Sequence, residues 1–273
     1  MSPDARAVQA GFFRGRIAPE YDLPAVRGLL AVIDQIPAEF AAEVLQAGRN
    51  AVTAVRLPTS EGPPLEIVVK SFGVRGWHRL KTLLVDSKAR RAWTGARALV
   101  RAGLSTPAPI AYLESRKKGR IDRAFFLAAR ERGAEEIRGL LRRLPEAELG
   151  PLVSALARVI RGGHDVGVVH RDLSDGNVLV RRGADGSFRF LFLDTNRVKQ
   201  RRRLGTLARA RSLVRLGIPP ALRMPFLAAY GGDQKPGALF VRWYGWSKAA
   251  FEGWLRIKKR LGLRRWARKL KLQ

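Results

Sequence analysis

The amino-acid pattern changes near residue 132, from short strand-like runs to helix-like segments, and this change constrains the fold more than any other feature. Before it, apolar side chains at helical spacing predict one helix over residues 86–101, which stops before a Gly and two Pro. Five runs rich in β-branched, aromatic or other apolar residues, bounded by turn-forming residues, predict strands over 40–46, 52–57, 65–72, 110–114 and 124–129.

The part after residue 132 is predicted to be mainly helical. Residues 135–143 and 145–162 predict two helices, the second with a stripe of Leu, Val and Ile that would face a core. An irregular loop from His164 to Asn177 then leads into a hairpin with predicted strands over 178–181 and 188–193. The chain beyond the hairpin is mostly helical and basic.

The sequence therefore predicts an α+β protein of two lobes. A β-rich N-terminal lobe with one helix spans residues 38–131, and a larger, mainly helical C-terminal lobe spans 132–273. Residues 25–36 form a short apolar stretch closed by Pro37, which predicts a helix that ends there, and we expect residues 1–37 to form an accessory segment.

Four side chains from three separate parts of the sequence have the chemistry and order that phosphoryl transfer requires. Asp172 lies five residues before Asn177, a spacing at which one loop can aim a carboxylate at a hydroxyl and an amide at a metal ion. Asp194 ends the next hairpin, which should bring it back near Asn177. Lys70 is the only Lys in the predicted meander, late in its third strand, where it could reach phosphates. Their order and spacing predict a protein-kinase-like fold, in which His170 braces the loop.

Two further stretches resemble the lipopolysaccharide kinases of the Kdo/WaaP type, a family that phosphorylates sugars of the lipopolysaccharide inner core. They are Ser87 to Trp93 with Leu104 to Pro109, and Leu193-Asp194-Thr195-Asn196-Arg197. The resemblance runs from about residue 40 to about 215. It implies that Asp172 is the base, that Asn177 and Asp194 hold Mg²⁺, and that Lys70 meets the phosphates of ATP.

The sequence also departs from the protein-kinase pattern. The helix after Lys70 has no Glu in its middle to pair with the lysine, and the expected nucleotide loop, Gly48-Arg49-Asn50, has one Gly where protein kinases have three. Ser174 replaces the Lys of protein-serine kinases, and no alanine-proline-glutamate follows Asp194. These differences favour a small-molecule or glycolipid acceptor over a protein.

The charge is strongly positive, with 52 Lys and Arg against 23 Asp and Glu and a net charge of +29. Residues 197–273 hold 21 of these bases and two acids, Asp233 and Glu252. Such a charge attracts phosphorylated substrates, anionic lipid or nucleic acid, although a GC-rich genome can also inflate the Arg content. The basic end includes Trp243-Tyr244-Gly245-Trp246, but the bases from Arg256 onward fall on every side of a helical wheel, which does not support a clean amphipathic membrane helix.

Composition restricts the location and the chemistry. No run of eighteen apolar residues could span a bilayer, and the first residues lack the pattern of a secretory signal. We therefore expect a soluble cytoplasmic protein, either free in the cytoplasm or peripheral at the inner face of the cytoplasmic membrane. With no Cys and three His, side-chain redox chemistry, a thiolate metal site and a His-rich zinc site are excluded.

The predicted function is an ATP- and Mg²⁺-dependent kinase of a Kdo or heptose hydroxyl in the lipopolysaccharide core, with a lipid A–core acceptor. The catalytic residues would be Asp172, Lys70 and His170. Two alternatives stay open at this point: another small-molecule or protein kinase on the same fold, and a non-catalytic kinase-like protein that binds anionic lipid or RNA. Nucleic acid is the less favoured partner because no signature for it is present.

Overall fold

A computed structural model describes residues 5–36, 40, 43–47, 50–59, 62–73, 82–83, 85–232 and 236–261. The chain divides into two compact units. Unit 1 comprises residues 1–135 and 179–200, and unit 2 comprises residues 136–178 and 201–273. Each unit is described by itself.

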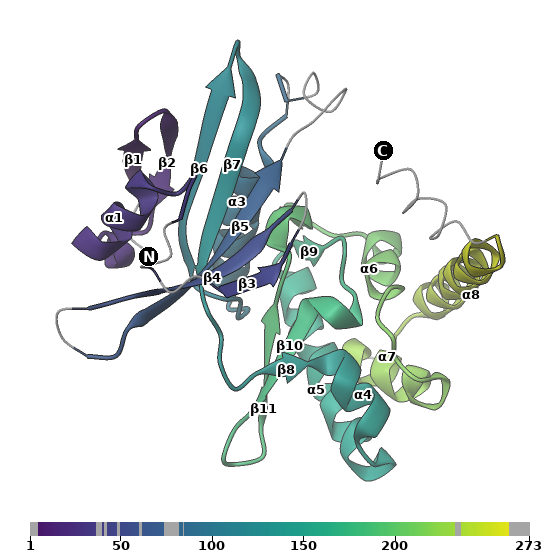
Figure 1. The fold of residues 1–273 in the computed structure, drawn as a ribbon. Coiled ribbons are helices and arrows are strands. Elements are labelled where there is room, and N and C mark those ends of the chain that lie inside the picture. The colour runs from purple at the N-terminus through teal and green to yellow at the C-terminus, as the bar shows by residue number, and fades with distance from the viewer. Residues whose placement is uncertain are drawn as a thin grey trace. The chain divides into compact units, whose positions relative to one another are not determined.

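Unit 1 is built on an antiparallel sheet that has seven strands within the described residues, in the order β1-β2-β6-β7-β5-β4-β3. The strands are β1 (Arg6–Ala10), β2 (Phe13–Ile17), β3 (Glu43–Gln46), β4 (Val52–Leu57), β5 (Leu65–Gly73), β6 (Pro109–Lys117) and β7 (Arg120–Ala129). Strands β6 and β7 form a long hairpin (Figure 1). The two residues of its turn, Lys118 and Gly119, both have positive φ, which is the backbone conformation that a tight two-residue hairpin turn favours.

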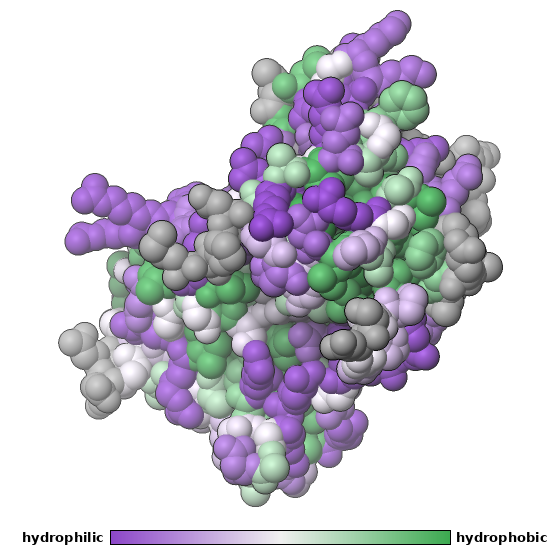
Figure 2. All heavy atoms as spheres, turned by 90° about the vertical axis from the view of Figure 1, so that its left-hand side faces the viewer, coloured by the Kyte–Doolittle hydropathy of each residue, from purple (hydrophilic) through white to green (hydrophobic). Residues whose placement is uncertain are grey.

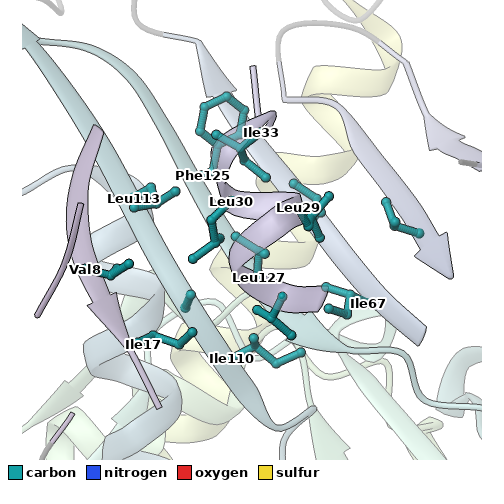
Figure 3. Close-up of a cluster of buried hydrophobic side chains, with 14 of the residues drawn as sticks. Val8, Ile17, Leu29, Leu30, Ile33, Ile67, Ile110, Leu113, Phe125 and Leu127 are labelled. Carbon is teal, nitrogen blue, oxygen red and sulfur yellow. The ribbon is translucent and has the colours of Figure 1, made fainter. Parts of the chain in front are cut away.

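Helix α1 (Pro24–Ala31) packs on one face of this sheet. Its buried residues Val26, Leu29 and Leu30 join a core cluster that includes Ile67 of β5 and Leu127 of β7 (Figure 3). The β1–β2 hairpin contributes to the same cluster and extends the sheet beyond β6. Figure 2, which faces the side on which α1 and this hairpin lie, shows hydrophobic residues in patches between hydrophilic ones. The residues before position 37 therefore complete the core of unit 1.

Helix α3 (Lys88–Arg101) packs on the other face. The Ser87 hydroxyl accepts a hydrogen bond of 2.9 Å from the backbone N–H of Arg90, which caps the helix. Small side chains and Trp93 on its inner face pack against Phe126 and its same-face neighbours in β7. Because successive strand residues point to opposite faces, Phe125 and Phe126 belong to different cores.

Unit 1 also contains most of the hairpin formed by β10 (Val178–Arg182) and β11 (Phe188–Phe192), followed by β12 (Val198–Gln200). The end of β11 is tied to the segment after α3. The Thr106 hydroxyl donates a buried hydrogen bond of 2.7 Å to the carbonyl oxygen of Phe192, and the Phe192 N–H donates one of 2.9 Å to the Ser105 carbonyl oxygen. Part of the first stretch that carries the family resemblance is thus joined to the residue just before the second.

Unit 2 is mainly helical. Its elements are α4 (Ile137–Arg143), α5 (Glu146–Asp165), β9 (Val168–His170), α6 (Thr206–Leu213), α7 (Arg223–Gly231) and α8 (Ala238–Arg260), and the two-residue strand β8 (Glu135–Glu136) lies at its boundary with unit 1. Helices α5 and α7 pack together, as do α6 and α8. Within the described residues, none of the helices has the length and hydropathy needed to cross a bilayer.

A buried histidine joins three of these helices. His164 of α5 is 2% exposed; its Nδ1 lies 2.7 Å from the hydroxyl of Tyr230 in α7, and its Nε2 lies 3.2 Å from the hydroxyl of Ser212 in α6. Ser212 donates its one proton to the carbonyl oxygen of Arg209 at 2.7 Å, so Nε2 must be the donor to Ser212, and Nδ1 accepts from Tyr230. Burial lowers the pKa of His164 to about 4 and raises that of Tyr230 to about 12, which keeps both side chains neutral.

Acid should therefore destabilise unit 2 through His164. Between the ordinary pKa of 6.5 and about 4, the unfolded chain binds a proton that the folded chain does not. The free energy of unfolding should consequently fall by roughly 3 kcal/mol as the pH decreases through this window. Chemical denaturation of wild type and His164→Gln across this pH range measures the effect, and the variant should lose less stability than wild type. Parallel pH profiles for the two proteins would contradict the assignment.

The mixed α+β fold class is confirmed. The predicted strand over 52–57 coincides with β4, and the helix predicted over 86–101 is α3, which begins two residues later. The helix predicted to end at Pro37 is α1, which ends at Ala31. The β1–β2 hairpin was not predicted, because each of its strands has only five residues and their alternation is interrupted by Gly and Arg.

Candidate active site

Lys70 lies on the face of the sheet that α3 covers. It is in β5, paired with Val52 of β4 and Phe126 of β7, and its neighbour Val69 points into the opposite core. Burial lowers the pKa of the Lys70 ammonium, and the carboxylate of Asp194 partly offsets this by raising it. The two side chains are therefore close enough to interact, although 124 residues separate them in sequence. Unit 1 brings these two predicted site residues together.

Asp194 has an unusual backbone conformation. Its φ of 53° and ψ of 50° lie in the left-handed region, which costs most residues energy but which Asp tolerates better than most. The short 3-10 helix η4 (Thr195–Arg197) follows, and Asn196 Nδ2 donates a hydrogen bond of 3.1 Å to Asp194 Oδ1. This conformation turns the backbone at the end of β11, and the bond from Asn196 leaves Oδ2 as the second oxygen for a ligand.

Helix α3 holds the residues after Asp194 at close range. The buried Thr195 hydroxyl donates a hydrogen bond of 2.7 Å to the Ala92 carbonyl oxygen. A Cβ atom at Gly95 would come within 2.0 Å of the Thr195 carbonyl oxygen, so no larger residue fits there. Gly95 and Thr195 were not predicted as site residues. The Gly inside the helix pattern was the available signal, since a glycine there often marks a close backbone approach.

Gly95→Ala should displace the segment that carries Asp194. An Ala in an open helical position normally stabilises a protein by about 0.5–1 kcal/mol, but here the clash should destabilise it by about 1–3 kcal/mol. Gly28→Ala in α1 is the matched control, because a Cβ there meets no atom within 4 Å. Thermal unfolding should show shifts of opposite sign for the two variants. A stabilised Gly95→Ala would contradict the close packing of α3 on η4.

The residues from Asp172 to Asn177 form a closed loop in unit 2. Asn177 Nδ2 donates a hydrogen bond of 2.8 Å to the Asp172 carbonyl oxygen, and the backbone N–H of Asn177 donates one of 2.9 Å to the Ser174 carbonyl oxygen. The Asp172 N–H donates a bond of 3.2 Å to Nδ1 of His170, which is buried. His170 therefore accepts a hydrogen bond from the loop backbone. The amide nitrogen of Asn177 is engaged, which leaves Oδ1 as the atom that could bind a cation.

Arginines outside the motif fix this loop. Arg215 forms an ion pair with the Asp172 carboxylate, and Arg138 of α4 donates from Nε to Asp175 Oδ2 at 3.0 Å. A Cβ at Gly217 would lie 3.0 Å from that same oxygen, so the segment from Arg215 to Gly217 runs against the loop. Sequence reasoning missed both arginines, because a chain with forty Arg offers no signal that distinguishes these two.

The expected nucleotide loop is described only in part. Gly48 and Arg49 lie outside the described residues. Asn50 precedes β4, and its buried side-chain oxygen has no hydrogen-bond partner among the residues that the structure describes. The backbone N–H of Ser71, next to Lys70, donates a hydrogen bond of 2.9 Å to the Ala51 carbonyl oxygen. Asn50 and Ala51 therefore lie beside the part of β5 that carries Lys70.

The carboxylate that influences Lys70 does not come from helix α3, where protein kinases carry a glutamate. Helix α3 contains no acidic residue, and the carboxylate that acts on Lys70 is Asp194. No cluster of three or more His, Asp or Glu that could hold a metal occurs among the described residues. A Mg²⁺ site does not need one, because this ion commonly takes one or two protein oxygens and completes its shell with phosphates and water.

Comparisons with known proteins agree with this architecture. The model of the "Lipopolysaccharide kinase (Kdo/WaaP) family" matches residues 77–219, which include Asp172, Asn177 and Asp194 but not Lys70. A solved structure described as "WaaP in complex with acyl carrier protein" is similar with a TM-score of 0.62 and 20% identity, over 91% of this chain and 98% of that one. No curated protein matches the chain. The kinase-like fold predicted from the sequence is confirmed, and the chain belongs to the lipopolysaccharide kinase (Kdo/WaaP) family.

Proposed function

We propose that this protein transfers the γ-phosphate of ATP to a sugar hydroxyl, on Kdo or heptose, in the lipopolysaccharide inner core. Membership of the family supports a phosphotransferase. The observation that carries the proposal is the position of half-buried Lys70 on the α3 face of the sheet, where the Asp194 carboxylate raises its pKa against the effect of burial. The two side chains would give unit 1 a cation for phosphates and a carboxylate for a metal ion. A half-buried lysine whose pKa is lowered by its surroundings is typical of functional sites, and the phosphates of a nucleotide would stabilise its charged form.

The donor atoms suit Mg²⁺ and ATP. Asp194 and Asn177 would each supply one oxygen, since Asp194 Oδ1 and Asn177 Nδ2 are already used within the protein. Carboxylate and amide oxygens are ligands that Mg²⁺ prefers. Bound there, the ion would neutralise negative charge on the phosphates. Lys70 would bind the phosphates that are not transferred.

Asp172 would orient the acceptor. In the proposed reaction the sugar oxygen forms a bond to the γ-phosphorus, the bond from that phosphorus to the β–γ bridging oxygen breaks, and the hydroxyl proton passes to the Asp172 carboxylate. Little proton removal is needed early in such a loose transition state, so Asp172 acts mainly by alignment. Arg215 would keep the carboxylate in place, and His170 would hold its backbone.

Acceptor profiling with radiolabelled ATP tests the proposal. Purified protein should label a lipid A–core acceptor that carries an unphosphorylated inner core, and it should not label a protein substrate. Labelling of protein at a comparable rate would favour a protein kinase on this fold. If no acceptor is labelled while ATP binds, the chain would be a kinase-like binding protein and the proposal would fail.

A further inference from the structure

Helix α8 has an inward face that packs against the other described residues of unit 2, and a second, apolar stripe that is largely exposed. The inward face contains Phe240, Tyr244 and Lys248, all buried. The second set of apolar residues recurs at intervals of three or four, which places it on a single face of the helix. This outer stripe consists of Leu239, Trp243, Trp246, Ala250, Trp254, Ile257 and, at the C-cap, Leu261. Its large side chains other than Trp243 are half or more exposed.

The inward contacts fix the direction in which the outer stripe faces. Lys248 Nζ donates hydrogen bonds of 2.9 and 2.7 Å to the carbonyl oxygens of Val214 and Leu216, just after α6. Burial lowers the pKa of this lysine, and Glu252 beside it, at 3.7 Å, partly offsets the shift. Helix α8 is therefore held at its middle by buried polar contacts, and it cannot rotate to bury the outer stripe without breaking them.

The edges of the outer stripe are basic. Arg242, Arg256 and Arg260 recur at helical spacing along one edge, and Lys258 lies at the other. The single acid in α8, Glu252, is directed inward, where it pairs with Arg223 of α7 and approaches Lys248. The outer stripe of α8 thus combines indole rings and aliphatic side chains with basic residues at its edges. Glu252, whose side chain is 38% exposed, is held in ion pairs with Arg223 and Lys248.

We propose that the outer stripe of α8 binds the surface of a membrane with anionic headgroups. Tryptophan favours the boundary between the hydrocarbon and the headgroups, and Arg and Lys beside it are attracted to anionic lipid. A helix of 23 residues is about 35 Å long and would lie along the surface, with its inward face still attached to unit 2. Membrane binding by the outer stripe would determine where the protein is located, and this proposal does not depend on the proposed kinase activity.

Sedimentation of the full-length protein with lipid vesicles, without ATP or acceptor, tests this proposal. Binding should be strong to phosphatidylcholine vesicles that contain phosphatidylglycerol and weak to phosphatidylcholine alone. The double variant Trp246→Ser and Trp254→Ser should bind the anionic vesicles at least about tenfold more weakly. The matched control is Phe12→Ser, which removes an exposed aromatic ring from the turn between β1 and β2 in unit 1 and should bind as wild type does.

A second pair of variants tests the charge. Arg242→Gln with Arg260→Gln should reduce the preference for anionic vesicles and the dependence of binding on salt, whereas Arg142→Gln with Arg143→Gln in α4 should change neither. All variants should melt at the wild-type temperature, because the replaced side chains are on the surface. Brominated lipid should quench wild-type tryptophan fluorescence and quench the double Trp variant less.

Two results would overturn the proposal. One is equal vesicle binding by the double Trp variant and the Phe12→Ser control. The other is equal wild-type binding to neutral and anionic vesicles. Binding of an acidic protein through the outer stripe without any partition onto vesicles would assign the surface to a protein partner instead. Kinase activity on a soluble core oligosaccharide, measured in the same variants, should be unchanged, and this separates the present proposal from the proposed function.

Discussion

Asp172→Asn should lower the rate of phosphate transfer to a core sugar by about a thousandfold and leave the affinity for Mg·ATP within about twofold. The amide keeps the size of the side chain but cannot accept the hydroxyl proton, and effects of this size are typical when a positioned acid–base group is lost. The ion pair with Arg215 is also lost, but the arginine is partly exposed and can be solvated. Stability should therefore change little.

Steady-state transfer and equilibrium nucleotide binding, measured on the same preparation, separate the two effects. Glu146→Gln, which removes an exposed carboxylate from the start of α5, is the matched acid-to-amide control and should retain wild-type transfer. Equal amounts of phosphorylated product from wild type and Asp172→Asn would show that Asp172 is not the base.

The second large effect is expected at Asp194. Asp194→Asn should weaken binding of Mg·ATP at least about tenfold and reduce transfer by about a hundredfold or more, because an amide is a poorer ligand for Mg²⁺ than a carboxylate. The same change should lower the pKa of the Lys70 ammonium further, since the carboxylate is what raises it against the effect of burial. The direction of this pKa change tests the geometry without relying on activity.

Titration of the Lys70 amine by NMR, with isotope-labelled lysine in the apo protein, provides that measurement, and Lys70→Met identifies the signal. Asp185→Asn, in the turn of the β10–β11 hairpin, is the control that removes a carboxylate from the same unit without approaching Lys70. An unchanged Lys70 titration in Asp194→Asn would mean that the two side chains do not interact.

The fold and the candidate site were predictable to the extent that they depend on patterns local in sequence. Strand β4 and helix α3 follow from hydrophobic spacing, and the order of Lys70, Asp172 and Asn177 follows from motifs of a few residues. The assignment of Asp194 as the acidic partner of Lys70 could not be made in advance, because their approach depends on how the residues after β11 pack on α3.

The supporting residues were not predictable for the same reason. The Thr195 hydroxyl donates a hydrogen bond to the backbone of Ala92, and Arg215 pairs with the carboxylate of Asp172, 43 positions earlier. The residues next to Thr195 and Arg215 in the sequence therefore give no sign of these contacts. A glycine within the helix pattern at position 95 was visible in the sequence. The structure explains it, because the Thr195 carbonyl oxygen lies within 2.0 Å of where a Cβ atom would be. Such contacts arise from tertiary packing, which residue spacing does not encode.

The outer stripe of α8 shows how the choice of segment limits a sequence prediction. A helical wheel that begins near Trp254 includes many bases and few apolar residues, and it shows no clear face. The helix begins at Ala238. The apolar face becomes visible on the helical wheel only when Leu239 and Trp246 are included together with Trp254. Knowing where the helix starts therefore changes the interpretation of the same residues.

Mass spectrometry of the core oligosaccharide tests the central claim most directly. Core from cells that carry the gene should contain one phosphate on an inner-core sugar that is missing from cells without it. Wild-type protein supplied in trans should restore that phosphate, and Asp172→Asn should not. Identical phosphorylation of the core with and without the gene would contradict the account.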